Sequence, residues 1–423
     1  MNYKLTTLEN GLRVVVVPLP SLESATLTVW VGVGSRYEEP KISGLSHFLE
    51  HMVFKGGKKY SSAKEVSEKI DTMGAENNAG TAHEWTNFYI KARAGLIGEA
   101  FDVLSDVVLR PILKTEDINR ERGVILEEIA MEEDTPVEKI GDVFGELIFS
   151  GSSLGVNIAG SPQTVSHIHK SDFVRYRNTH YDAKNIVITV AGGVDVIKTV
   201  KLAEKYFGTL SGTKRENAEQ FISKQTAPRL KVEYKKSEQA HLILGFLGHP
   251  RGYELRYAES ILATLLGRGM SSRLFTEVRE KRGLAYAVGS SVARYVDTGA
   301  FATYAGVDLK RIDEAIKVIL DQMYGLKNTK YPVSKKELNK AKEYLKGRMA
   351  LALEDTNAVN DFFGQRVLFD QAIETPEQVF KKVDKVSLSE VLEVAKDLFV
   401  PEKLNLAIIG PYKDKTRFEK LIR

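Results

Sequence analysis

Two histidines and a glutamate lie close together in the segment His47-Phe48-Leu49-Glu50-His51. The segment has the pattern of an amphipathic helix, on which residues four apart lie one above the other, so both imidazoles can bind a single metal ion. Glu50 lies between them and would be held beside that ion, where a carboxylate can accept a proton from a bound water. The alternative is a helix with two incidental histidines, so a third ligand is the first test.

A catalytic zinc ion has three protein ligands and one position open for water. The segment Glu121-Arg122-Gly123-Val124-Ile125-Leu126-Glu127-Glu128-Ile129 is predicted to lie in a long helix that begins near Thr115. Glu121 and Glu128 are two helical turns apart and share a face near the core, where a carboxylate is costly unless it is paired or bound to metal. Glu127 points about 100° away and is expected in solvent. The alternative places all three carboxylates on the charged face of a surface helix.

The motifs HFLEHMVFKG, NNAGTAHEWTNFY, ERGVILEEI and MEEDTP resemble the pitrilysin and mitochondrial-processing-peptidase family of inverzincin (H-x-x-E-H) zinc metallopeptidases. The resemblance extends through most of the chain and is closest to the half-length bacterial members. It implies one zinc ion per chain, with His47, His51 and Glu128 as its ligands and Glu50 as the general base. It also implies that Glu121 supports the site.

A second candidate group lies between Arg279 and Tyr286. A guanidinium and a phenol can donate hydrogen bonds to a peptide carbonyl and to the oxyanion that forms when water attacks it. In the family an arginine and a tyrosine seven residues later have this role, which implies Arg279 and Tyr286 as catalytic and substrate-binding residues. Arg282 is a competing candidate with a different spacing. Without the resemblance, a charged helix end and a strand tyrosine are the simpler interpretation.

The resemblance implies that Asn78 and Ala79 bind substrate. In the family the corresponding edge strand pairs with the extended backbone of a peptide, a form of recognition that tolerates many side chains. An ordinary strand explains the same residues equally well. Gly80 stands where family members usually carry an aromatic residue, so the adjoining side-chain pocket departs from the family pattern.

Composition favours a cytoplasmic enzyme. The 423 residues include no cysteine, so zinc must rely on histidine and carboxylate ligands. The 60 Lys and Arg residues are scattered and nearly balanced by 56 Asp and Glu, which argues against nucleic-acid binding. No stretch approaches the ~20 apolar residues of a membrane span, and the N-terminus lacks the pattern of a secretion signal. We therefore expect neither a nucleic-acid partner nor a membrane span.

The predicted elements repeat in the same order along two halves of the chain. The first half has strands at 13–17, 27–33, 77–81, 86–94 and 186–191, the metal-motif helix, and a helix opened by a capping box at 62–65 and closed by Gly74. The second half has strands around Val232 and at 241–246, 285–292, 300–305 and 404–409, a helix through Ile261 and Leu266, and capping boxes at 334–337 and 387–390.

This repetition suggests a duplicated domain. We expect an α+β fold of two homologous α/β-roll domains, each a mostly antiparallel sheet packed against several helices. Residues 1–210 would form the zinc-binding domain, 211–228 a polar linker, and 229–423 a repeat without zinc that carries the arginine and tyrosine. Aligning the halves places the metal motif on Ser260-Ile261-Leu262-Ala263-Thr264, which has no metal-binding groups.

The expected function is that of a zinc-dependent endopeptidase that hydrolyses unstructured peptides. The resemblance implies that two chains close as a clamshell around a chamber, with Arg279 and Tyr286 of one chain acting at the zinc of the other. A homodimer is sufficient, and a paralogous subunit is the alternative. Other functions are a non-catalytic or partner-dependent subunit of a processing-peptidase-like complex, or the processing of one precursor. A zinc amidohydrolase acting on small molecules would need further ligands.

Overall fold

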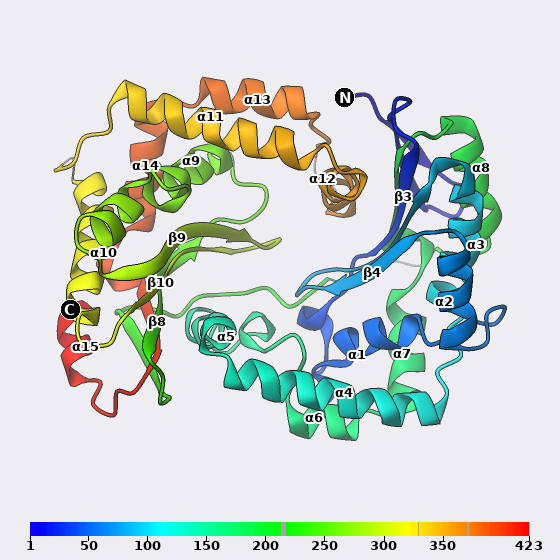
Figure 1. Cartoon of the computed structure of the whole chain (residues 1–423), viewed down its shortest axis with the longest axis horizontal. Coiled ribbons are helices and arrows are strands. Elements are labelled where there is room, and N and C mark those ends of the chain that lie inside the picture. Colours follow the sequence, from blue (N-terminus) through cyan, green and yellow to red (C-terminus); the bar gives the residue numbers. More distant parts are fainter. Residues whose placement is uncertain (213–216, 329, 370–371, 423) are drawn as a thin grey trace. The chain divides into compact units, whose positions relative to one another are not determined.

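The computed structural model of the chain describes residues 1–212, 217–328, 330–369 and 372–422 (Figure 1). The chain forms two compact units. Unit 1 comprises Met1–Ala130, Val156–Glu219 and Ala350–Glu377, and unit 2 comprises Met131–Gly155, Gln220–Met349 and Gln378–Arg423. The helices that run from one unit into the other are α4 (Thr115–Asp134), α11 (Lys335–Ala352) and α13 (Pro376–Lys385).

Unit 1 is built on a mixed sheet with the strand order β1-β2-β6-β3-β5-β4. The strands are β1 (Lys4–Thr7), β2 (Arg13–Pro18), β3 (Ser24–Val31), β4 (Glu76–Thr81), β5 (Thr86–Arg93) and β6 (Ile186–Gly192). The pair β2–β6 is parallel and the other pairs are antiparallel. Successive valines of β2 are buried on opposite faces of the sheet, which explains its continuous apolar run.

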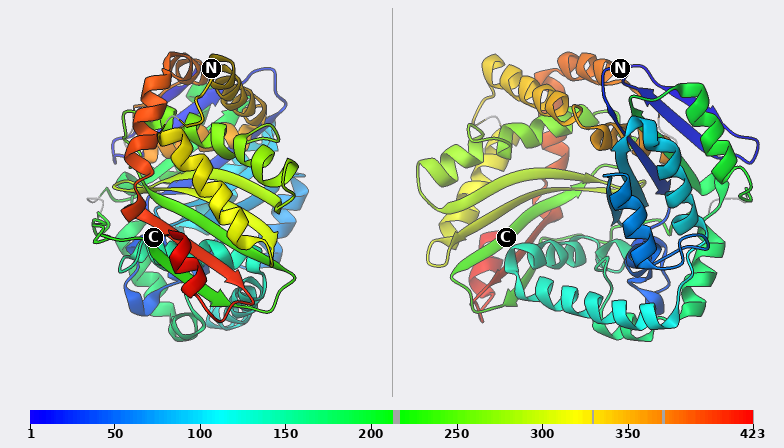
Figure 2. Two further views of the ribbon diagram at one scale, coloured as in Figure 1. Left: turned by 90° about the vertical axis from the view of Figure 1, so that its left-hand side faces the viewer. Right: turned by 45° about the vertical axis from the view of Figure 1, so that its right-hand side comes forward.

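Helices cover both faces of this sheet (Figures 1 and 2). The core on one face includes residues of α1, α3 and α8, whereas α12 packs against β3 and β6 on the other face. Buried Asn360 of α12 donates hydrogen bonds to the Thr26 carbonyl oxygen (2.8 Å) and the Thr28 hydroxyl (3.0 Å). The helices are α1 (Leu45–Val53), α2 (Ala63–Thr72), α3 (Ile97–Leu109), α6 (Pro162–His167), α7 (Lys170–His180), α8 (Val196–Phe207) and α12 (Thr356–Leu368), with short turns η1 (Ser35–Tyr37), η2 (Pro40–Ile42), η3 (Ala94–Leu96) and η5 (Ala183–Asn185).

Unit 2 contains a sheet with the strand order β7-β11-β8-β10-β9. Its strands are β7 (Arg229–Tyr234), β8 (Gln239–Gly248), β9 (Ala285–Arg294), β10 (Gly299–Asp308) and β11 (Leu404–Gly410). The pair β7–β11 is parallel and the other pairs are antiparallel. The order matches β2-β6-β3-β5-β4 of unit 1, with the parallel pair in the same place, so the predicted repetition of strands is confirmed.

The helices of unit 2 are α5 (Pro136–Ile148), α9 (Arg256–Gly267), α10 (Ile312–Lys327), α14 (Leu388–Leu398) and α15 (Thr416–Ile422), with short turns η4 (Ser153–Gly155), η6 (Phe275–Glu280) and η7 (Pro401–Lys403). Helix α5 packs its apolar side chains on β11 and β8. Helix α9 follows β8 in the sequence, as α1 follows β3. It therefore has the place of the metal-motif helix in the repeated order.

One histidine links three elements of unit 2. His249, directly after β8, forms hydrogen bonds with Glu259 of α9 through Nδ1 (3.0 Å) and with Asp397 of α14 through Nε2 (2.8 Å). Burial lowers the pKa of His249, but the hydrogen bonds and charges of these carboxylates outweigh it and raise the pKa above its usual value.

The α+β class is confirmed, with mostly antiparallel sheets packed against helices. The compact units nevertheless differ from the contiguous domains 1–210 and 229–423. Helix α5 from the first half belongs to unit 2, and α12 from the second half belongs to unit 1. Both faces of each sheet are apolar and must be covered, and one covering helix for each sheet comes from the other half of the chain. Within the predicted linker 211–228, residues 213–216 lie outside the described residues.

Candidate metal centre

Helix α1 carries His47, Glu50 and His51. The helix follows Gly44, whose φ of +95° suits glycine and which has no side chain to cap the helix. The carboxylate of Glu38 supplies the cap by accepting hydrogen bonds from the backbone N–H groups of Gly44 (2.7 Å) and Ser46 (2.6 Å). Burial raises the pKa of Glu38 to about 7, although the hydrogen bonds with Ser46 and Gly44 act in the opposite direction. The apolar residues of α1 are buried in the unit 1 core: Leu45, Phe48, Leu49, Met52 and Val53.

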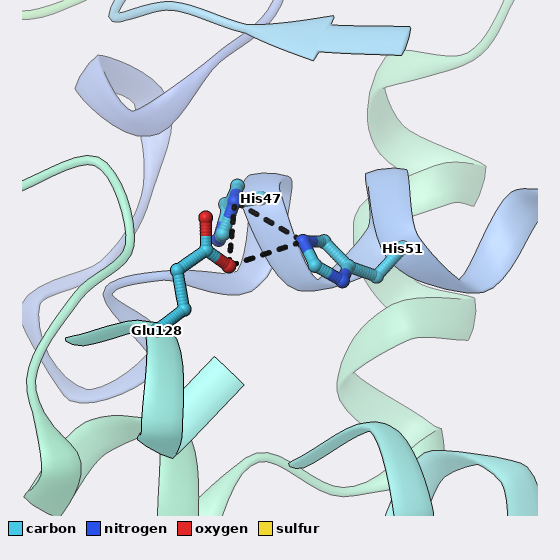
Figure 3. Close-up of side chains that lie close together, drawn as sticks. All are labelled: His47, His51 and Glu128. Carbon is cyan, nitrogen blue, oxygen red and sulfur yellow. Dashed lines mark hydrogen bonds and ion pairs between the residues drawn. The ribbon is translucent and has the colours of Figure 1, made fainter. Parts of the chain in front are cut away.

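Three side chains converge beside α1 (Figure 3). The Nε2 atoms of His47 and His51 are 3.3 Å apart. Glu128 reaches them from α4, and its Oε2 lies 3.8 Å from His47 Nε2 and 3.5 Å from His51 Nε2. Ligands at about 2.0–2.1 Å in a tetrahedral zinc site are roughly 3.3 Å from one another. The donor types and their separations therefore suit a zinc ion.

In the part of the chain that the structure describes, His47, His51 and Glu128 are the one set of three or more His, Asp or Glu side chains close enough together to share a metal ion. Burial and, to a lesser extent, the charge of His51 lower the pKa of His47 to about 4. His47 is therefore neutral near pH 7, and neutral imidazole is the form that binds metals. The neighbouring Glu127 is exposed and does not belong to this set.

Glu121 holds His51 from the side opposite the proposed metal. His51 Nδ1 lies 3.0 Å from Glu121 Oε1, and Lys55 Nζ lies 2.5 Å from Glu121 Oε2. Burial raises the pKa of Glu121, but hydrogen bonds from Lys55 and His51 outweigh it and hold the pKa below its usual value. An ionised Glu121 accepts a hydrogen bond from the Nδ1–H group of His51, which leaves the Nε2 lone pair free to bind a metal. Among the described residues, the buried Nδ1 of His47 has no hydrogen-bond partner, so packing rather than a carboxylate orients that ring.

Glu50 is the one acidic residue of α1. Burial is the main cause that raises the pKa of its carboxyl, and the charge of Glu128 acts in the same direction. The Thr81 side chain and, to a lesser extent, the charge of His51 act in the opposite direction. A carboxylate whose pKa lies above its usual value is better suited to accept and return a proton near neutral pH.

Asn78 and Ala79 lie in β4, the edge strand of the unit 1 sheet. They pair with Tyr89 and Phe88 of β5 on one side, and β4 also contacts α1. The other edge of an edge strand presents backbone N–H and C=O groups that can pair with an added strand. The structure therefore places an edge strand next to the metal-motif helix.

Arg279 and Tyr286 lie together in unit 2, whereas the metal-motif residues lie in unit 1. Arg279, in the π-helical turn η6, donates a hydrogen bond from Nη1 to the Tyr286 carbonyl oxygen (2.6 Å). Its guanidinium lies over the Tyr286 ring, 5.1 Å from the ring centroid. Tyr286 is in the edge strand β9 and is 75% exposed. The competing candidate Arg282 is paired with Glu277 at 2.6 Å.

Sequence reasoning missed Lys55 and the capping role of Glu38. Lys55 follows His51 by one helical turn, and this spacing was the available signal. Glu38 gives no such signal, because it lies outside the helix that it caps and its contact depends on the path of the intervening loop. Tertiary structure therefore adds residues to the site that spacing alone does not identify.

No helix in the described ranges combines the length and apolar content needed to cross a membrane.

Comparisons with known proteins identify similar chains. The family described as insulinase (peptidase family M16) matches residues 13–160, and the family described as peptidase M16 inactive domain matches residues 167–345. An uncharacterized zinc protease of Streptomyces coelicolor is 37% identical over 97% of this chain and 90% of its own length. An uncharacterized zinc protease of Bacillus subtilis is 35% identical over 96% of this chain and 98% of its own length.

Two solved structures share the fold. A protease from Helicobacter pylori has a TM-score of 0.90 at 23% identity, covering 97% of this chain and 99% of its own. A Pseudomonas fluorescens structure described as a peptidase M16 inactive domain also has a TM-score of 0.90, at 18% identity, covering 97% of this chain and 98% of its own.

Proposed function

Because the chain belongs to peptidase family M16, we propose that it is a zinc-dependent endopeptidase that hydrolyses unstructured peptides, with Glu50 as its general base. The observation that carries the proposal is the convergence of three donor atoms, from His47, His51 and Glu128, at separations of 3.3–3.8 Å. Glu50 lies on the same helix as the two histidines. The relatives described as zinc proteases support the same metal and reaction.

Different residues of the chain have different roles in the proposed peptide hydrolysis. A zinc ion held by His47, His51 and Glu128 would polarise the scissile carbonyl and lower the pKa of a water. The Glu50 carboxylate accepts the proton of that water and returns it to the amine that leaves. Glu121 accepts a hydrogen bond from the Nδ1–H group of His51 and so keeps the Nε2 lone pair directed at the metal position.

Peptide binding is assigned to the edge of β4. An extended peptide would pair with the backbone at Asn78 and Ala79, which selects unfolded segments because a folded protein offers few free backbone groups. Such pairing is largely independent of side chains. The substrate class is therefore unstructured peptides of varied sequence.

Arg279 and Tyr286 are assigned the role of stabilising the oxyanion. Their guanidinium and phenol would donate hydrogen bonds to the oxygen of the scissile carbonyl as it becomes negative. In this proposal the pair comes from a second copy of the chain, or from a paralogous subunit, which closes a clamshell chamber around the peptide. The cytoplasm remains the predicted location.

The test is hydrolysis of a quenched fluorescent peptide of ~10 to 20 residues by the zinc-loaded protein, by the chelated protein and by Glu50→Gln. We expect reversible loss of activity on chelation and an inactive Glu50→Gln variant that still binds zinc. Glu127→Gln is the matched control, because this exposed carboxylate lies outside the metal set. If the zinc-loaded protein cleaves no peptide, a non-catalytic or partner-dependent subunit becomes the better interpretation.

A further inference from the structure

The short segment from Gly34 to Glu38 connects β3 to the loop before α1 and contacts the turn between β4 and β5. The Ser35 N–H donates to the Ala82 carbonyl oxygen (3.2 Å), and the Arg36 N–H donates to the His83 carbonyl oxygen (2.9 Å). A Cβ added at Gly34 would lie 1.9 Å from the Ala82 carbonyl oxygen. The two backbones are therefore in direct contact, and no larger residue than glycine fits at position 34.

A buried ion pair fastens the same contact. Arg36 Nη1 lies 2.7 Å from Glu84 Oε1, and the two side chains are 2% and 1% exposed. The guanidinium also donates a hydrogen bond to the Glu219 carbonyl oxygen (2.8 Å). Burying two charges has a large desolvation cost, which offsets the free energy gained from their attraction. The contribution of the pair is therefore sought in the geometry that it fixes, and not in the stability of the fold.

The other end of the segment holds the metal-motif helix. Glu38 accepts hydrogen bonds from the backbone N–H groups of Gly44 and Ser46, and His47 is the next residue along the helix. The turn held by Arg36 directly follows β4, the strand assigned to peptide binding. One short segment therefore joins the end of the peptide-binding strand to the start of the helix that carries the proposed metal ligands.

We propose that Arg36 and Glu84 are positioning residues that fix β4 relative to α1, and thereby place an extended peptide at the correct distance from the proposed metal ligands. This inference rests on the proposed function for its substrate. The pair acts through the backbone of the turn, where the Arg36 N–H donates a hydrogen bond to the His83 carbonyl oxygen. Loss of the pair should therefore weaken peptide binding without changing zinc binding.

The test uses Glu84→Gln and the double variant Arg36→Met/Glu84→Met. Glu84→Gln leaves the Arg36 charge buried without its partner and could prevent folding, whereas the double variant removes both charges. Both are made in the Glu50→Gln background, so that a fluorescent peptide binds without being cleaved. Hydrogen exchange of the β4 amides, zinc Kd by chelator competition and peptide Kd by anisotropy are measured. Arg36→Lys, which keeps the charge, is the conservative variant. Asn360→Ala is the matched control, because it removes a buried polar contact between α12 and β3, elsewhere in unit 1.

We expect faster exchange in β4 and a peptide Kd raised on the order of 10-fold, since a strand that is no longer held in place must be ordered when the peptide binds. The zinc Kd should not change. Arg36→Lys, which keeps the positive charge, should retain more peptide affinity than Glu84→Gln. Unchanged exchange in β4, or an equal loss of peptide affinity in Asn360→Ala, overturns the positioning role. The parent Glu50→Gln protein could bind no peptide while hydrogen exchange in β4 is still faster in Glu84→Gln. In that case the proposed function fails, and the substrate part of the inference fails with it.

Discussion

Replacing Glu121 with glutamine should weaken zinc binding although Glu121 is not a proposed ligand. The Glu121 carboxylate has two partners, with Oε1 3.0 Å from His51 Nδ1 and Oε2 2.5 Å from Lys55 Nζ. A glutamine has one oxygen and one NH₂ group. If its oxygen accepts from His51, its NH₂ group must face the Lys55 ammonium, donor against donor. The variant therefore loses the contact that orients the imidazole or places two donors together.

The expected magnitude follows from this geometry. Loss of a carboxylate that orients a metal-binding histidine typically lowers metal affinity about 10- to 100-fold, which is about 1.4–2.7 kcal/mol. Lys55→Met should have a smaller effect, about 2- to 5-fold, because partly exposed ion pairs contribute about 1 kcal/mol or less. Glu128→Gln, which removes a proposed ligand, should lose more affinity than either variant.

The assay is competition for zinc with a chromophoric chelator at pH 7.5, with circular dichroism to verify folding. Glu127→Gln serves as the control on the same helix and should bind zinc as the wild-type chain does. A wild-type zinc Kd in Glu121→Gln would refute the orienting role. Equal losses in Glu127→Gln and Glu128→Gln would refute the assignment of the third ligand.

Three further predictions concern packing, pH and the oxyanion. A Cβ at Gly364 would lie 2.3 Å from Trp30 Nε1, so Gly364→Ala should lower the free energy of unfolding in urea by about 1–3 kcal/mol. Gly347→Ala is the control, because nothing lies within 4 Å of its new Cβ, and an equal loss of stability in both variants would contradict the prediction. Because the pKa of His249 is raised, its protonation stabilises the fold below pH 6.5, and this contribution disappears as pH rises through the raised value. The free energy of unfolding should therefore fall more steeply above pH 6.5 in the wild type than in His249→Gln, and parallel curves would refute this. Tyr286→Phe should lower kcat on the order of 100-fold with zinc Kd unchanged in the same preparation, and a wild-type kcat would remove Tyr286 from the mechanism.

Sequence patterns predicted the strands well because long apolar runs are buried on both faces. The strands predicted at 186–191 and 404–409 correspond to β6 and β11, and every residue of both observed strands is buried. Strand β1 was missed because most of its residues are exposed at the sheet edge and lack an apolar pattern. The exchange of α5 and α12 between the units could not be predicted, since periodicity reveals an apolar face but not the sheet that it covers.

The candidate site was predictable where helix geometry alone decides which side chains meet. The spacing of His47 and His51 requires their proximity on any helix. The pairing of Arg36 with Glu84 could not be predicted, because the two residues are 48 positions apart and no local rule connects them. The spacing on one helix therefore predicts the two proposed histidine ligands, whereas the Arg36–Glu84 pair and the Glu38 cap require the tertiary structure.

Among the described residues, the duplicated fold offers one candidate metal site, in unit 1 and not in unit 2, for a physical reason. Helix α9 has the place of α1 in the repeated order, and its fully buried Glu259 is satisfied within the protein by His249 and by Arg294 at 2.6 Å. A carboxylate already paired with a guanidinium and an imidazole has no need of a cation. In unit 1 two imidazole nitrogens and a carboxylate oxygen instead face one another. Elemental analysis should therefore find one zinc ion per chain, reduced to none in His47→Ala/His51→Ala, and two ions per wild-type chain would contradict this account of the repeat.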